Sequence, residues 1–252
     1  MTAQEDKAAT LGHPSYVWRF GQERRLRLID RYAPLEGKTI LDVGCGLGTY
    51  VERFREFTDQ AYGVDIEVER VVEGGKSVPN LLAAAAEALP FIDNSFDVLV
   101  LHEVLEHVAD DGQAMEEAYR LLKPRGRIVI FAPNRLYPLE THGIWWRGRY
   151  RFGNFPLVNY LPHSLRRRLC PHVRAYTLGD LHQLLSDFEH RTIVQRQVFP
   201  GYDNIFARRA RLASALRRVT YYLEDTPLRV LGLSHFLVVE KPAMPLDRTT
   251  GR

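Results

Sequence analysis

A glycine-rich segment after a short buried run limits the folds open to this chain more than any other feature. Residues 39–43 form a mainly apolar run, and glycine then occupies alternate positions at Gly44, Gly46 and Gly48. Glycine lets the backbone turn sharply and approach a ligand without a Cβ clash. A loop of this kind at the end of a buried strand favours an α/β fold with a ligand site at the carboxyl edge of its sheet.

Strands and helices alternate through the first half of the chain. Periodicity predicts strands over residues 39–43, 61–65, 81–84, 96–101 and 127–132, with helices over 16–32, 50–57, 67–73 and 112–122. Such alternation indicates βαβ units and a parallel sheet. The apolar strands VLVL and IVIF indicate a sheet covered on both faces. The first half is therefore predicted to be a doubly wound α/β domain.

The second half continues this sheet with two interruptions. Patterning predicts helices over 164–169, 177–188 and 206–222, and strands over 191–199 and 235–240. Insertions are expected at about 134–175 and 203–232. We expect a single domain over 16–242 with its core at 38–135, a loose tail over 1–15, and a second tail over 243–252.

An acidic residue follows the glycine loop at the spacing expected of a residue that binds a ribose. Asp65 ends the second predicted strand, where a carboxylate can accept hydrogen bonds from ribose hydroxyls. The glycine order is one residue shorter than the dinucleotide pattern, and the chain carries no P-loop signature. A nucleoside-containing cofactor other than a dinucleotide is therefore expected.

The segments DVGCGLGTY, GVDI, AEALPFIDNSFDVLVLHEVLEHV and LLKPRGRIVIFAPN follow one another over residues 38–135. Together they resemble the class I S-adenosylmethionine (SAM)-dependent methyltransferases, and most closely the methyltransferase type 11 branch that includes quinone-biosynthesis enzymes. The resemblance implies a Rossmann-like, mostly parallel seven-stranded sheet with insertions after the fifth and sixth strands. It also implies SAM as cofactor and S-adenosylhomocysteine as product.

The resemblance assigns the cofactor-binding residues by position. The glycine loop would face the methionine part of SAM, Asp42 its amino group, and Asp65 its ribose. Leu101 and His102 would lie beneath the sulfonium. The full implied set is Asp42, Gly44, Cys45, Gly46, Gly48, Thr49, Asp65, Ile66, Ala86, Glu87, Leu101 and His102. Ala85 stands where relatives often carry an aspartate that binds the adenine amino group. One adenine contact is therefore expected to be lost, at a cost of about 1 kcal/mol.

Methyl transfer to an oxygen of a small or lipid-linked acceptor, by direct in-line displacement, is the favoured activity. His102, His107 and His142 are the candidate catalytic bases, and His107 could pair with Glu103 four residues earlier on a helix face. The residues predicted to line the acceptor pocket are Asn134, Arg135, Tyr137, Glu140, His142, Trp145 and Trp146. His102 and His107 stand five residues apart instead of the four of a zinc-binding helix, which argues against metalloprotease chemistry. No metal-ligand cluster is apparent in the sequence, so no metal is expected.

The second half is basic through arginine, with Lys241 as its only lysine, and rich in aromatic residues. Nucleic acid, an anionic membrane surface or an acidic small substrate would fit this composition. The predicted basic amphipathic helix over 206–222 favours the membrane surface. The competing hypotheses are an RNA or protein methyltransferase and a non-catalytic SAM-binding module. Without an apolar leader or a membrane-spanning run, the expected location is cytoplasmic, associated with a membrane surface.

Overall fold

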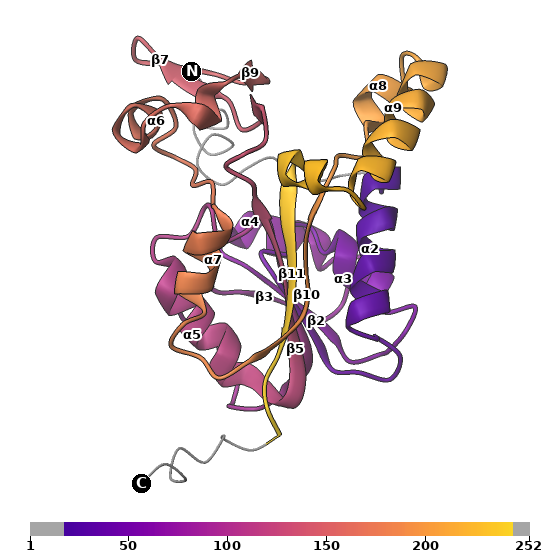
Figure 1. Ribbon diagram of the computed structural model, residues 1–252. Coiled ribbons are helices and arrows are strands. Elements are labelled where there is room, and N and C mark those ends of the chain that lie inside the picture. The colour runs from indigo at the N-terminus through magenta and orange to yellow at the C-terminus, as the bar shows by residue number, and fades with distance from the viewer. Residues whose placement is uncertain (1–17, 244–252) are drawn as a thin grey trace, which may run out of the picture.

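The computed structural model describes residues 18–243 (Figure 1). The predicted tail over 1–15, the first two residues of the predicted helix over 16–32, and residues 244–252 lie outside this range. Within it, the strands and helices predicted for the first half are all present, with shifts of a few residues at their ends.

One seven-stranded sheet forms the centre of the molecule. Its order is β10-β11-β5-β4-β1-β2-β3, and β11 alone runs antiparallel to its neighbours β5 and β10. The predicted doubly wound, mostly parallel seven-stranded sheet is confirmed. The strands are β1 (Ile40–Val43), β2 (Ala61–Asp65), β3 (Leu81–Ala83), β4 (Phe96–His102), β5 (Leu122–Pro133), β10 (Arg191–Val198) and β11 (Ser234–Glu240).

Helices cover both faces of this sheet because alternate strand residues point to opposite sides. On one side, Leu99 and Leu101 of β4 belong to the core formed with α5 (Asp111–Leu121) and α7 (Leu178–Leu184). On the other, Val98 and Val100 pack in the core formed with α2 (Phe20–Tyr32) and α3 (Thr49–Phe54). The short helix α4 (Val68–Gly74) joins β2 to β3. Figure 1 shows α5 and α7 on the side of the sheet opposite α2 and α3.

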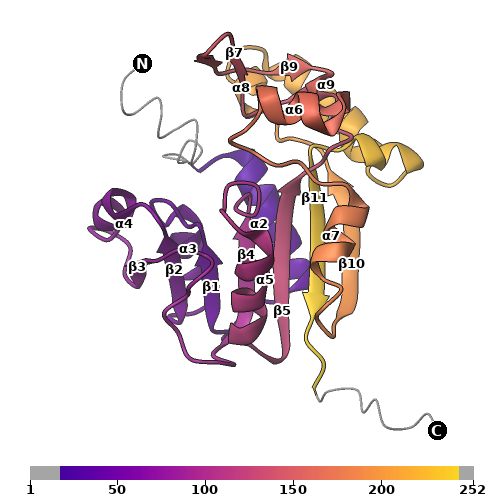
Figure 2. The ribbon, with the colours of Figure 1, turned by 90° about the vertical axis from the view of Figure 1, so that its left-hand side faces the viewer.

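The first insertion leaves β5 and builds a small layer above the strand ends (Figure 2). Its own apolar core contains Ile144, Val158, Cys170 and Val173. An isolated bridge between Asn134 and Tyr176 closes its base. Its elements are β6 (Leu139–Glu140), β7 (Ile144–Trp146), β8 (Arg149–Arg151), β9 (Phe155–Pro156), η1 (Val158–Tyr160) and α6 (His163–Leu169).

The second insertion differs from the single helix predicted over 206–222. It forms α8 (Asp203–Phe206) and α9 (Ala210–Leu223), followed by η2 (Pro227–Leu231). Arg217 of α9 explains the break. Its guanidinium donates to the carbonyl of Gly201 at 2.7 Å and to Asp203 at 3.2 Å, which folds the start of the insertion back against α9.

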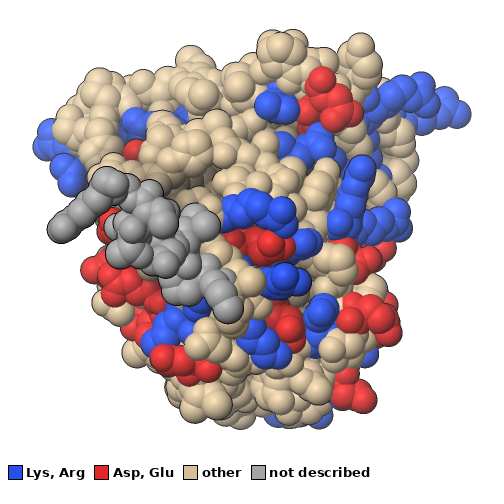
Figure 3. Space-filling model, turned by 60° about the horizontal axis from the view of Figure 1, so that its bottom comes forward, with Lys and Arg blue, Asp and Glu red and all other residues tan. Residues whose placement is uncertain are grey.

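The surface charge is mixed at the end of the sheet away from the insertions. On the face shown in Figure 3, basic and acidic residues are interspersed instead of segregated. Opposite charges also pair where β10 begins and β11 ends, for example Arg127 and Arg191 with Glu240, each at 2.8 Å. The net basic character of the second half is therefore not concentrated on this face.

Candidate active site

Two adjoining cavities lie at the carboxyl ends of the central strands. The larger measures about 550 Å³ and the smaller about 290 Å³. They have Gly44, Arg70, Glu103 and His107 in common as wall residues. A ligand can therefore occupy both cavities at once, with one end in each.

The glycine loop follows β1 and forms part of the cavity wall. Gly44 has φ +72°, and a Cβ at this position would overlap the side chain of Val104. Gly44, Cys45 and Gly46 line the larger cavity, as does Thr49 at the start of α3. Gly48 has φ +81° but faces Leu81, so its role is to shape the turn and not to line either cavity.

The smaller cavity contains the residues predicted to bind adenosine. Asp65 is 5% exposed, and its carboxylate accepts hydrogen bonds from the backbone N–H groups of Gly46 at 2.8 Å and Glu67 at 2.9 Å. Ile66 lines the same cavity although it is 57% exposed. Ala86 and Glu87 complete this wall, while Leu101 lies in the core beneath it and reaches neither cavity.

Asp42 is a buried carboxyl group on the wall of the larger cavity. Burial raises its pKa well above the usual range, and the negative charge of Asp65 raises it further. Among residues 18–243, no cationic side chain forms an ion pair with Asp42. A ligand that carries an ammonium group would offset both effects.

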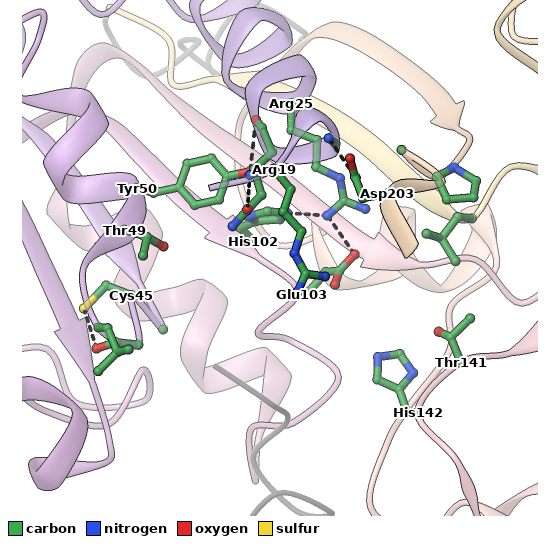
Figure 4. A pocket seen from close by; sticks show the side chains of 18 of the residues that line it. Arg19, Arg25, Cys45, Thr49, Tyr50, His102, Glu103, Thr141, His142 and Asp203 are labelled. Atoms are coloured by element: carbon green, nitrogen blue, oxygen red, sulfur yellow. Dashed lines mark hydrogen bonds and ion pairs between the residues drawn. The ribbon is translucent and has the colours of Figure 1, made fainter. Parts of the chain in front are cut away.

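His102 stands at the end of β4 between aromatic rings. Its ring makes an edge contact with Tyr50, at a centroid distance of 4.7 Å, and lies 5.0 Å from Phe131. The Arg25 guanidinium contacts its Nε2 atom and also pairs with Glu103 at 2.8 Å (Figure 4). Burial and the charge of Arg25 together lower the pKa of His102 to about 3. His102 is therefore a neutral wall residue in this arrangement.

His107 and His142 meet beside Glu106, on the side of the larger cavity away from Tyr50. The two rings have a centroid distance of 5.6 Å. The residues from Glu103 to His107 form a turn and not the expected helix, because Glu103 has φ +57° and the His107 N–H bonds to the carbonyl of Val104. Glu103 and His107 therefore do not share a helix face, which was the expected basis of their pairing.

Glu106 is 1% exposed, and neither of its carboxylate oxygens has a hydrogen-bond partner among the described residues. Burial raises the pKa of Glu106 to about 8, and the charge of Glu103 adds to this effect. Burial alone would lower the pKa of His142. Its hydrogen bond to Glu140 and the nearby acidic charges outweigh burial, so the pKa is raised.

A buried ion pair holds His142 in place. Glu140 is 2% exposed, and one of its oxygens lies 3.0 Å from His142 Nδ1. Its other oxygen accepts from Arg166 at 2.6 Å. Arg166 is itself buried and also donates to Asn159 and to the carbonyl of Val173. The first insertion thus fixes the ring of His142 at the cavity.

The structure places only one of the predicted acceptor residues, His142, on the cavity wall. Asn134 was expected there, but its buried amide holds the carbonyls of Val230 and Gly232. Arg135 donates to the carbonyl of Leu161, and Glu140 lies behind His142. Trp145 contacts Tyr150, whereas Trp146 is 46% exposed. Neither cavity includes Tyr137.

Several wall residues come from segments that the sequence patterns did not connect with the site. The first turns of α2 contribute Arg19, Gly21, Gln22 and Arg25, and the base of the second insertion contributes Pro200, Gly201, Asp203 and Asn204. These two segments touch, since the Gly21 N–H donates to Asp203 at 3.1 Å. The only sequence signal was the unusual number of arginines in α2. No sequence pattern connected Glu106 with the site, apart from its position next to His107 in the chain.

A protein-family model described as a methyltransferase domain matches residues 41–130. A ubiquinone biosynthesis O-methyltransferase of Thiobacillus denitrificans is 36% identical over 118 residues, covering 44% of this chain and 51% of the relative. A ubiquinone/menaquinone biosynthesis C-methyltransferase of a Ruegeria species is 30% identical over 158 residues, covering 55% and 63%. The chain spans about half the length of most of the curated relatives it matches.

Solved structures share the fold at low identity. A SAM-dependent methyltransferase from Mesorhizobium loti superimposes with a TM-score of 0.58 and 17% identity, covering 85% of this chain and 96% of its own. The [4+2]-cyclase SpnF superimposes with a TM-score of 0.56 and 17% identity, covering 90% and 84%. Because one neighbour is named a cyclase, fold similarity alone does not identify the reaction.

Proposed function

We propose that this chain is a class I SAM-dependent methyltransferase that transfers a methyl group from SAM to an oxygen of a small or lipid-linked acceptor. The match to a methyltransferase domain and the similarity to quinone methyltransferases support this proposal. The observation that carries the proposal is the pair of adjoining cavities. The smaller cavity is lined by the residues predicted to bind adenosine. The larger cavity is lined by histidine, arginine and carboxylate side chains.

The residues present fit SAM. Gly44 lines both cavities and packs against Val104 where a Cβ would not fit, and Asp65 lies on the wall of the smaller cavity. Ile66 offers an exposed apolar surface against which the adenine ring can pack. The buried carboxyl of Asp42 is suited to the ammonium group of the methionine part. We propose that Gly44, Cys45, Gly46, Thr49, Asp42, Asp65, Ile66, Ala86 and Glu87 form the binding site, with Gly48 shaping its turn.

When bound, SAM supplies a methyl group on a positively charged sulfur, which is a good leaving group. The chain then has to position the acceptor oxygen in line with that methyl group and exclude water. Arg25, held between Glu103 and Ser234, and the ring of Tyr50 form one wall of the acceptor space. His107 and His142 form another wall. We assign the removal of the acceptor proton to this second wall and not to His102, whose low pKa makes it a weak base.

Curated relatives named as quinone methyltransferases act on oxygen in some cases and on carbon in others. We propose an oxygen acceptor because the wall formed by His107 and His142 carries groups that can promote the loss of a hydroxyl proton. The RNA or protein methyltransferase hypothesis receives no support from these relatives. The non-catalytic hypothesis accounts for the Glu140–Arg166 pair as a stabilising contact, but it does not account for the His142 ring that this pair holds at the cavity.

The experiment that tests the proposal has two steps. Calorimetric titration with SAM, S-adenosylhomocysteine and NAD should give saturable binding of the first two compounds alone. Incubation with SAM labelled in its methyl group, and with hydroxylated or demethylated quinone precursors as acceptors, should then label a lipid-soluble product. Binding without transfer to any hydroxyl acceptor would contradict the enzyme assignment, and binding of NAD alone would contradict the cofactor assignment.

Replacing Asp65 by alanine should weaken SAM binding by about 2 kcal/mol, the range for a hydrogen bond to a charged group. Asp65 closes the smaller cavity and also fixes the loop through the Gly46 N–H, so both contributions are lost. Titration calorimetry of the two proteins measures the difference. Asp59→Ala is the matched control, because this aspartate is 98% exposed and lies outside both cavities. Equal SAM affinity of Asp65→Ala and the unmodified protein would show that the ribose binds elsewhere.

We also propose that α9 rests on an anionic membrane surface. Leu212, Val219 and Tyr222 are 45%, 58% and 73% exposed, and their helical spacing places them on one face together with Arg211 and Arg218. Exposed Leu228, Val230 and Leu231 of η2 follow directly. No helix among residues 18–243 is long and apolar enough to cross a bilayer. A lipid-linked acceptor could enter from such a surface.

The double replacement Arg211→Ala and Arg218→Ala should weaken binding to anionic vesicles by about 2 kcal/mol, since each basic residue near such a surface contributes about 1 kcal/mol. Flotation with phosphatidylglycerol vesicles, and with phosphatidylcholine vesicles for comparison, measures this. Arg191→Ala is the control, because this exposed arginine lies at the start of β10, away from both insertions. Equal binding to both kinds of vesicle would contradict a role for charge.

A further inference from the structure

We propose that Glu106, His107 and His142 bind a divalent transition-metal cation at the junction of the two cavities. Each residue offers one ligand atom, and these three atoms lie within 4.8 Å of one another. His107 and His142 line the larger cavity, and His107 also lines the smaller one. A cation held by them would therefore face the space assigned to the acceptor.

Glu106 points to a cation independently of the two histidines. Its carboxylate is 1% exposed, and neither oxygen has a hydrogen-bond partner among the described residues. A buried carboxyl group without partners is costly, and buried charges in proteins are normally paired or bind metals. The acidic environment extends further, because Glu103 lines both cavities next to Glu106. A bound cation would supply the positively charged partner that the Glu106 carboxylate lacks among the described residues.

His142 is already oriented as a metal ligand. Its Nδ1 is 3.0 Å from Glu140, and Glu140 is fixed by Arg166 at 2.6 Å. A histidine ligand commonly donates its second ring N–H to a carboxylate, which sets the tautomer and raises the basicity of the coordinating nitrogen. Nε2 of His142 is therefore free to coordinate from the cavity side. This chain of contacts is formed entirely from buried or half-buried side chains of the first insertion.

The donor atoms indicate which cation binds. Two imidazole nitrogens and one carboxylate oxygen favour a first-row transition metal, such as cobalt, manganese or zinc, over magnesium or calcium, which prefer oxygen ligands. Three protein ligands also leave coordination positions open for a further oxygen. The site is thus suited to substrate binding more than to a purely structural role.

The catalytic role of the cation rests on the proposed methyl transfer, whereas its binding does not. A cation held by these three residues would make an acceptor hydroxyl in an open position lose its proton more easily, because the positive charge lowers the pKa of a bound oxygen. The proton would pass to solvent water. The acceptor oxygen would form its bond to the methyl carbon as the carbon–sulfur bond broke, and the electron pair of that bond would stay on sulfur as a neutral thioether. No oxidant or reductant is required.

The test is a titration of the untagged, chelator-treated protein with cobalt(II), followed by visible absorption and by calorimetry. The unmodified protein should bind one cobalt per chain. Glu106→Gln keeps the shape of the buried side chain and should lower the affinity by more than about 100-fold, beyond the loss expected for a residue that only supports a ligand. His142→Ala should lower it similarly. His163→Ala, at an exposed histidine outside both cavities, should bind cobalt like the unmodified protein.

SAM titration of the same metal-free samples separates this proposal from the proposed function. SAM binding without saturable cobalt binding would overturn the metal site and leave the cofactor assignment intact. Cobalt binding that Glu106→Gln leaves unchanged would also overturn the site. Cobalt binding without SAM binding would support the metal site and contradict the proposed function. Unchanged thermal unfolding of metal-free Glu106→Gln confirms that the variant is folded.

Discussion

Replacing Arg166 by alanine lowers the free energy of unfolding by about 3–5 kcal/mol, the range for removing one partner of a buried ion pair. Arg166 is 3% exposed, and its guanidinium bonds to Glu140, to Asn159 and to the carbonyl of Val173. Its loss leaves Glu140 as a buried charge opposite only His142. Urea unfolding, followed by the fluorescence of the tryptophans in the first insertion, measures the change.

Arg167 provides the matched control for this prediction. It is the next residue of α6 and is exposed, so Arg167→Ala should change the free energy of unfolding by less than about 0.5 kcal/mol. The double variant Arg166→Met and Glu140→Leu removes both charges and should recover most of the loss. Similar stability of the Arg166→Ala and Arg167→Ala proteins would mean that the Glu140–Arg166 pair does not hold the insertion together.

Replacing His142 by alanine lowers kcat by about 10²- to 10⁴-fold, the usual contribution of a positioned group that assists proton loss in the transition state, here as a ligand of the proposed cation. His142 projects into the larger cavity away from Cys45 and Thr49 (Figure 4), so it contacts the acceptor side and not the glycine loop. SAM affinity should therefore stay within about twofold. Steady-state kinetics with labelled SAM, together with calorimetry, separate the two quantities.

A structural role for His142 would give a different pattern. In that case the alanine variant would lose SAM affinity and thermal stability together with activity. His102→Ala is the informative comparison, because His102 packs between Tyr50 and Phe131 and has a pKa of about 3. It should lose stability through lost packing while retaining more activity than His142→Ala. A greater loss of activity in His102→Ala would return the catalytic assignment to the end of β4.

Most of the residues that line the cavities beside the glycine loop could be predicted because their positions depend on local patterns. The glycine loop and Asp65 follow consecutive strands of one βαβ unit, so their relative positions come from neighbouring pieces of chain. The same logic predicted the alternation of strands and helices up to β5. Gly48 and Leu101 belong to the predicted segments but line neither cavity. Leu101 points into the core, and Gly48 lies in the turn before α3, against Leu81.

The acceptor half could not be predicted in the same way, because it depends on contacts between distant segments. Arg25 reaches His102 across 77 residues, and Arg166 reaches Glu140 across 26. Asn134 looked like a pocket residue because polar residues after a parallel strand usually face the ligand. It instead satisfies buried carbonyls of the second insertion. No periodicity in the sequence distinguishes these two uses of an asparagine.

Both insertions are closed at the base where they leave the sheet. The first returns to its starting point at the Asn134–Tyr176 bridge, and the second leaves β10 at Val198 and rejoins β11 at Ser234, its partner in the sheet. Each is therefore a cassette whose ends are only one strand spacing apart, and Asn134 links the two cassettes at their base. Such a cassette can be lengthened, shortened or exchanged at little entropic cost to the rest of the chain. A chimaera that takes its cassettes from a relative should acquire the relative's acceptor preference and keep the original affinity for SAM.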